Sequence, residues 1–176
     1  MGRPCGQDDV VTLRPRRPSD DGAIRRLNDA AFGGTHESRL IAAIRDSRLA
    51  AIELVAVGDE TIVGHILFSV LAVTIECRSI RALALAPMAV RPGRQRQGIG
   101  SALVHAGLHA AREQGWQAII ALGHPAFYPR FGFSAEKAAC LEAPFQGDAF
   151  MVLELETGVL AGCGRVVYPP PFDIAG

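Results

Sequence analysis

The spacing of apolar residues along the chain predicts three helices. Apolar side chains recur every three or four positions after Ser19 or Asp20, and again after Thr35, so two amphipathic helices are expected with these residues as N-caps. A third helix is expected to begin at Gly98. Gly115 follows it, at the position where a left-handed glycine commonly ends a helix.

Other segments have continuous or alternating apolar runs that are typical of strands. These segments are residues 10–14, 52–57, 61–75, 81–90, 118–122, 150–155 and 166–168. The short turn after residue 57 predicts an antiparallel hairpin. The order strand, helix, strand between residues 81 and 122 predicts a right-handed parallel crossover. The fold class expected from this pattern is α/β, in the α+β sense.

The length and apolar content suit one compact domain. The chain has 176 residues, of which 49% are hydrophobic, and we find no internal repeat or linker. We therefore expect a single domain over residues 1–176, with residues 1–9 as a flexible N-terminal tail.

Charge and hydropathy exclude several classes of partner. Eighteen Lys and Arg residues balance 18 Asp and Glu residues, so no overall field favours nucleic acid or an anionic membrane. No run of 18 apolar residues is present, and the N-terminus lacks the apolar core of a signal peptide. The sequence predicts a cytoplasmic protein with no nucleic-acid or membrane partner. A cluster at Arg14, Arg16 and Arg17 is expected to be solvated surface.

The four cysteines, Cys5, Cys77, Cys140 and Cys163, are widely spaced in the sequence. No CxxC pair is present, so the pattern fits neither a zinc site nor a disulfide framework. We expect four reduced thiols and no metal site.

The segment "MAVRPGRQRQGIGSALV", Met88 to Val104, is the candidate binding loop of the sequence. Two glycines open a helix there, and unpaired N–H groups at a helix start attract anions. A P-loop would need lysine where Ile99 stands, and a dinucleotide fingerprint would need glycine at Leu103. Both ATP and dinucleotide motifs are therefore excluded.

Two motifs resemble those of the GNAT superfamily of N-acetyltransferases. "QRQGIG", Gln95 to Gly100, is similar to its Q/R-x-x-G-x-G/A acyl-CoA motif, and "FYPRFGF", Phe127 to Phe133, is similar to its Y-x-[KR]-x-G-F segment. The chain resembles the YhbS-like subgroup in particular, although that subgroup tends to have Asp after the glycine where this chain has His124.

The resemblance implies a mixed, mostly antiparallel central sheet with a parallel β-α-β acyl-CoA-binding unit and helices on both faces. It implies acetyl-CoA as co-substrate, held between two splayed strands, 81–90 and 118–122. The implied cofactor-binding residues are Met88, Ala89 and Val90 for the pantetheine arm, and Gln95, Arg96, Gln97, Gly98, Ile99, Gly100 and Ser101 for the pyrophosphate.

By the same resemblance, Tyr128 is the general acid that protonates the leaving thiolate. The general base is left open, because residues 82–90 contain no carboxylate where the family often has a glutamate. His124 is the leading candidate.

The other candidates for the base are His36 or Glu37 and a water chain. His65 is considered as a side chain facing the substrate cleft. Glu53 and Glu76 are expected to be exposed.

The function expected from the resemblance is direct transfer of an acetyl group to an amine of a small molecule or peptide. The alternative is a non-catalytic acyl-CoA-binding sensor or interaction module, and a third hypothesis is a loop that binds another phosphate, such as a nucleotide. The apolar tail "VVYPPPF" suggests a homodimer.

Overall fold

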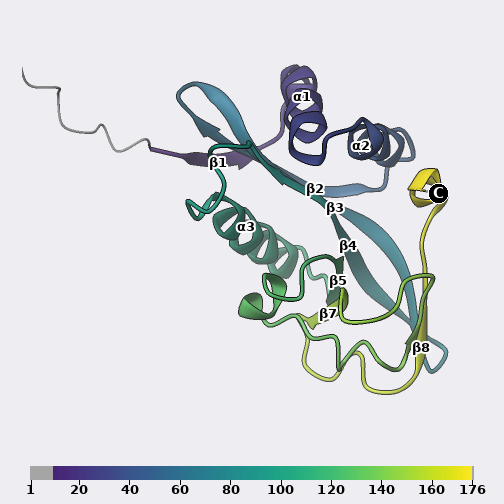
Figure 1. Cartoon of the computed structure of the whole chain (residues 1–176). Coiled ribbons are helices and arrows are strands. Elements are labelled where there is room, and N and C mark those ends of the chain that lie inside the picture. The colour runs from purple at the N-terminus through teal and green to yellow at the C-terminus, as the bar shows by residue number, and fades with distance from the viewer. Residues whose placement is uncertain (1–9, 176) are drawn as a thin grey trace, which may run out of the picture.

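The structure, a computed structural model, describes residues 10–175, so the expected tail at residues 1–9 lies outside the described residues (Figure 1). The helices are α1 (Asp21–Phe32), α2 (His36–Asp46) and α3 (Ile99–Glu113), with short 3-10 turns η1 (Pro18–Asp20), η2 (Tyr128–Phe131) and η3 (Pro170–Ala175). The strands are β1 (Thr12–Pro15), β2 (Ala50–Gly58), β3 (Thr61–Ile75), β4 (Arg78–Val90), β5 (Ala118–Leu122), β6 (Leu141–Glu142), β7 (Phe150–Glu154) and β8 (Gly164–Val167).

One mixed sheet organises these elements. Its strand order is β1-β2-β3-β4-β5-β7, and β8 pairs with the second half of β3 and with β6. Every neighbouring pair is antiparallel except β4 with β5 and β6 with β8. The α+β architecture expected from the sequence is confirmed.

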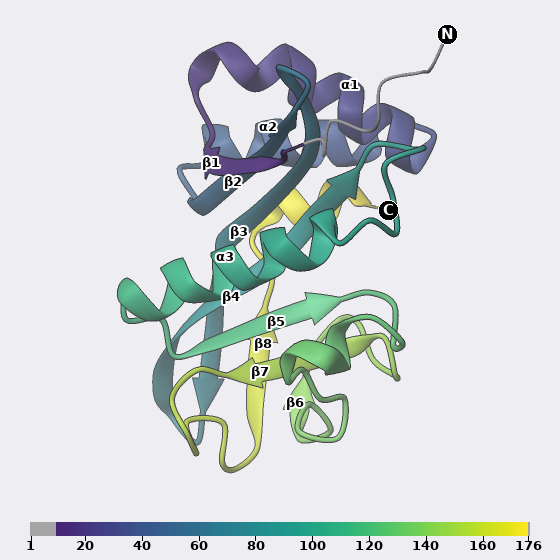
Figure 2. The ribbon, with the colours of Figure 1, turned by 90° about the vertical axis from the view of Figure 1, so that its left-hand side faces the viewer.

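Helices cover both faces of the sheet, as Figures 1 and 2 show. α1 and α2 lie on one face and bury Ile24, Ile41 and Ile44 against it. α3 crosses the opposite face, where Gly107 lies against the ring of Phe68 of β3 and Leu103 lies over Gly64. The apolar stripes that predicted the helices are thus the surfaces that contact the sheet.

The predicted elements are present, with shifted ends. The first strand begins at Thr12, and the strand predicted from residue 81 begins at Arg78. Three elements were not predicted, namely η1, β6 and η3. None of the helices among the described residues is long and apolar enough to cross a membrane.

The parallel pairing of β4 with β5 covers only part of β4. It runs from Ala82 opposite Ala118 to Leu85 opposite Ala121, whereas β4 continues to Val90. Residues 88–90 pair with β3 on one side, after a register shift, and with no described strand on the other. This stretch beyond the end of the β4–β5 pairing is called the splay below.

The contribution of β5 to stability can be tested, because the strand is buried along most of its length and exposed at its last residue. Ile119 is 0% exposed and Leu122 is 45% exposed. We expect Ile119→Ala to lower the free energy of unfolding by about 2–4 kcal/mol, because the deletion leaves a cavity in the packed core. Leu122→Ala, on the same strand, should cost less than about 1 kcal/mol. Urea denaturation measures both, and equal losses would contradict the assigned burial of Ile119 and exposure of Leu122.

Candidate active site

The loop from Arg91 to Gly98 joins β4 to α3 and is fixed by its own side chains. The Arg91 guanidinium donates to the Ile62 carbonyl at 2.8 Å, and the backbone N–H of Arg91 donates to the Val63 carbonyl at 2.9 Å. The Gln97 amide donates to the Gly93 carbonyl at 3.2 Å. The loop is thus anchored to the β2–β3 hairpin and to itself before any ligand is considered.

The loop presents a row of backbone N–H groups at the start of α3. Gly98 has φ of +85° and Arg96 has φ of +61°, which turns successive peptide units in alternate directions. None of the backbone N–H groups from residue 95 to residue 101 donates to a described protein acceptor. These donors and the helix dipole form an anion-binding site of the kind that holds phosphates.

The end of β4, the start of α3 and the aromatic segment after β5 meet at Gly100. A Cβ atom built on Gly100 would lie 3.6 Å from Met88 Cε, 3.6 Å from Val90 Cγ2 and 3.7 Å from Phe127 Cζ. The structure therefore brings the predicted cofactor-binding residues of the loop and strand together, beside the segment that carries Tyr128.

Tyr128 begins η2 and is 7% exposed. Its ring lies where a side chain at residue 123 would lie: a Cβ on Gly123 would be 2.4 Å from Tyr128 Cε2. Phe127 and Phe133 pack edge-on against the ring, with centroid distances of 5.1 and 5.4 Å. Glycine at position 123 is therefore what lets this ring enter the core beside β5.

The Tyr128 hydroxyl is the polar end of an otherwise buried side chain. It makes no hydrogen bond to another described residue, and it is not among the fully buried oxygens without a partner, so it borders open space. Burial raises the pKa of Tyr128 to about 12. The phenol is therefore protonated at neutral pH, as a general acid must be.

His124 is joined to Tyr128 by one turn of backbone. Its carbonyl accepts the N–H of Phe127 at 2.9 Å and the N–H of Tyr128 at 3.4 Å, and its side chain is exposed. His36 and Glu37 lie instead in the first turn of α2, a helix on the opposite face of the sheet from α3 (Figure 1).

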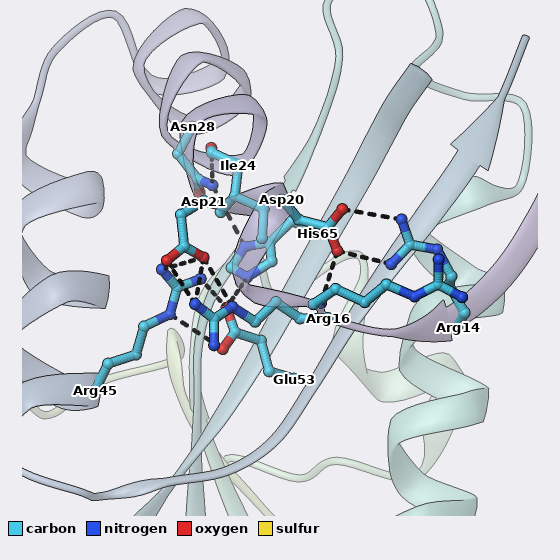
Figure 3. Close-up of polar contacts among 10 residues, drawn as sticks. Arg14, Arg16, Asp20, Asp21, Ile24, Asn28, Arg45, Glu53 and His65 are labelled. Carbon is cyan, nitrogen blue, oxygen red and sulfur yellow. Dashed lines mark hydrogen bonds and ion pairs between the residues drawn. The ribbon is translucent and has the colours of Figure 1, made fainter. Parts of the chain in front are cut away.

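A polar network beneath α1 includes His65, considered above as a cleft residue, and Glu53, for which the expectation of exposure is wrong (Figure 3). His65 of β3 is 0% exposed, so it does not face a cleft. Its Nε2 lies 2.8 Å from Glu53 Oε1, and its Nδ1 lies 3.3 Å from Asn28 Nδ2. Glu53 is not an exposed carboxylate, because its side chain is only 9% exposed and also pairs with Arg45.

The network extends to the arginine cluster that was expected to be solvated. Arg14 makes a two-bond ion pair with Asp20, at 2.7 and 2.9 Å, and Arg16 pairs with Asp21. Arg45 also contacts Asp21, at 3.1 Å. The expectation was therefore wrong for Arg14 and Arg16, whose ion pairs tie β1 and the residue after it to η1 and α1. Glu76, by contrast, is exposed as expected.

Protonation in the network follows from burial and charge. Burial raises the pKa of the Glu53 carboxyl, but hydrogen bonds from His65 and Arg45 outweigh this effect and lower it to about 2. Burial lowers the pKa of His65, which is therefore neutral at neutral pH. The neutral ring donates through Nε2 to Glu53 and accepts the Asn28 amide at Nδ1.

Two cavities lie away from this site. One of about 430 Å³ is bounded by α1, the β2–β3 turn and Arg91, and one of about 380 Å³ lies beside β6 and β7. Neither is lined by Tyr128, His124 or the start of α3, so the splay and the loop, not a closed cavity, define the candidate site. Among the described residues, no three His, Cys, Asp or Glu side chains form a group that could hold a metal ion.

Comparison with known proteins identifies relatives over nearly the whole chain. Residues 50–135 match the family model described as an acetyltransferase (GNAT) domain. The uncharacterized N-acetyltransferase YhbS of Escherichia coli K12 is 32% identical over 167 residues, which cover 93% of this chain and 99% of YhbS.

Solved structures of two relatives share the fold. The crystal structure of E. coli YhbS in complex with CoA has a TM-score of 0.86 and 30% identity, covering 97% of this chain and 96% of that one. A GNAT family acetyltransferase from Brucella melitensis, in complex with acetyl-CoA, has a TM-score of 0.78 and 30% identity, covering 94% and 99%.

The buried network makes stability depend on pH. We expect Glu53→Gln to lower the free energy of unfolding by about 2–4 kcal/mol at pH 7, because Arg45 loses its buried counter-charge. The folded-state pKa of about 2 lies below the ordinary 4.5, so the carboxylate stabilises fully above pH 4.5 and progressively less as pH falls toward 2. The difference between variant and wild type should shrink over that range.

Urea titrations at pH 7 and near pH 3 measure this difference. Glu136→Gln, an exposed carboxylate without a side-chain partner among the described residues, should stay within about 0.5 kcal/mol of wild type. A Glu53→Gln variant as stable as wild type at pH 7 would contradict the assigned network.

Proposed function

The chain belongs to the GNAT family of N-acetyltransferases, and on this premise we propose that it transfers an acetyl group from acetyl-CoA directly to an amine within a ternary complex. The observation that carries the proposal is the row of backbone N–H groups without protein acceptors at residues 95–101, placed beside the splay of β4 and β5. The two relatives whose structures contain CoA or acetyl-CoA support the choice of ligand.

The residues at this site fit the parts of the cofactor. We propose that Gln95, Arg96, Gln97, Gly98, Ile99, Gly100 and Ser101 hold the pyrophosphate through their backbone N–H groups. Met88, Ala89 and Val90 would bind the pantetheine arm along the edge of β4 that β5 leaves unpaired. The thioester supplies an activated acyl group, and one N–H of this edge would polarise its carbonyl.

Two side chains are proposed to handle the protons. An alkyl ammonium with a pKa near 10 must lose a proton before it attacks, and the departing thiolate must gain one. We propose Tyr128 as the acid, since burial keeps its phenol protonated. We propose His124 as the base, since its backbone is bonded to Tyr128 and its side chain is exposed.

One observation favours a second candidate function, a non-catalytic acyl-CoA-binding module. β4 has no carboxylate on any of its residues from Arg78 to Val90. A sensor would bind acetyl-CoA with the same loop but would catalyse no acetyl transfer. Wild type and a Tyr128 variant would then both lack turnover.

Further proposals concern the protein as a whole. We propose a single catalytic domain over residues 1–176, acting in the cytoplasm on a small-molecule or peptide amine. The tail that includes Tyr168 and Phe172 packs on its own chain, with their rings 5.0 Å apart. A homodimer would therefore use the outer surface of this tail.

Binding tests the loop first. Calorimetric titration should show micromolar binding of acetyl-CoA and free CoA and no binding of ATP. Gln97→Glu places a negative charge among the phosphate-facing N–H groups, so acetyl-CoA affinity should fall at least about tenfold. The matched control is Gln114→Glu at the other end of α3, which should bind like wild type. Equal loss in both variants, or no heat with wild type, would refute the assignment.

Turnover tests Tyr128. With an amine found by screening for CoA release, Tyr128→Phe should lower kcat about 100-fold or more and leave acetyl-CoA affinity within about twofold. Tyr168→Phe is the control, because burial also raises the pKa of Tyr168 to about 12 but the residue lies in the C-terminal tail. Loss of binding in Tyr128→Phe would instead assign the residue a structural role.

A further inference from the structure

Two cysteines that are distant in the sequence are neighbours in the fold. Cys140 directly precedes β6 and Cys163 directly precedes β8. These strands pair in parallel, with Leu141 opposite Gly164. The cysteines occupy the preceding position of the same register, and the Gly164 N–H donates to the Cys140 carbonyl at 3.0 Å.

The side chains of both cysteines project to the same face. Two residues further along the strands, Glu142 and Arg165 form an ion pair at 2.8 Å on the exposed face. Because side chains alternate along a strand, Cys140 and Cys163 point to that same face, and both are exposed. The two thiols are near enough that Cys140 raises the pKa of the Cys163 thiol.

We propose that Cys140 and Cys163 are an oxidation site at which a peroxide converts the two thiols into an intramolecular disulfide. Neighbouring strands place paired Cα atoms about 5 Å apart, which is within the roughly 4.4–6.8 Å that a disulfide spans. The two chains therefore need no large movement to form the bond. The proposal does not rest on the acetyltransferase function.

The chemistry balances with hydrogen peroxide as the oxidant. The Cys140 thiolate attacks one peroxide oxygen, which gives a Cys140 sulfenic acid and releases hydroxide. Cys163 sulfur then attacks the Cys140 sulfur, and the sulfenic oxygen leaves as water with the Cys163 proton. Hydroxide takes up the proton that Cys140 released, so two thiols lose two electrons and peroxide becomes two waters.

The reverse order of attack gives the same product. Both thiols are exposed, so peroxide can reach either one. Whichever sulfur is oxidised first is then attacked by the other, because the register of β6 and β8 holds the two cysteines side by side.

The bond would join β6 to β8 and close a loop that contains all of β7. Since β7 is the strand that pairs with the free side of β5, the disulfide would restrain local opening next to the parallel unit. A closed loop of this length also restricts the unfolded chain, which raises the melting temperature.

The test uses the full chain carrying Cys5→Ser and Cys77→Ser, so that only the proposed pair remains. Equimolar hydrogen peroxide should remove both titratable thiols, lower the intact mass by two hydrogens and yield one non-reduced peptide that links Cys140 to Cys163. Dithiothreitol should reverse each change. The melting temperature of the oxidised protein should be higher by roughly 5–10 °C.

A control with Cys140→Ser in the same background should keep its remaining thiol far longer and should form no internal bond. The proposal is overturned if the two-cysteine protein gains oxygen instead of losing hydrogens. It is also overturned if the product is a disulfide-linked dimer, or if the thiols survive peroxide as long as the single cysteine does.

Discussion

The point at which β4 and β5 stop pairing is the constraint on which the candidate site depends. Up to Leu85 and Ala121 the two strands share hydrogen bonds, and both are buried on both faces. Beyond that point β4 continues to Val90 beside β3 but without β5, so the N–H and C=O groups on the β5 side need another partner. A pantetheine arm, which carries amides of its own, can provide that partner without any change in the sheet. The catalytic groups that we propose all lie around this opening.

The helices serve the opening in different ways. α3 is the binding element in our proposal, because its first N–H groups and the preceding loop lie beside the end of β4. α1 and α2 are held to the other face by a chain of charges that runs through Asp21, Arg45 and Glu53 to His65. Such buried ion pairs are costly unless every charge is matched, so the network favours one placement of these helices over all others.

Local patterns were sufficient for most of the fold. The strand at residues 118–122 was predicted with the bounds that β5 has, because its apolar run is bordered by polar residues on both sides. β6 could not be predicted, since two residues show no periodicity and the partner strand β8 is remote in the sequence. The binding loop was visible as a glycine pattern, whereas the roles of Tyr128 and His124 came only from resemblance.

The error at Glu53 shows why charged residues resist prediction. Alternation along β2 places Glu53 on the same face as Val55, which is fully buried, so the pattern did contain the correct orientation. The partners that make burial tolerable, Arg45 and His65, come from other elements. The sequence alone does not show that they meet.

The contact between Gly123 and Tyr128 has a consequence for how this protein can diverge. The ring fills the volume that any larger residue at 123 would need, so the two positions cannot vary independently. A lineage that gains a side chain at 123 must first move or lose the tyrosine, and with it the proposed acid. Substitution at Gly123, which has no side chain, is thereby restricted by the proposed role of Tyr128, and the two residues are expected to change together.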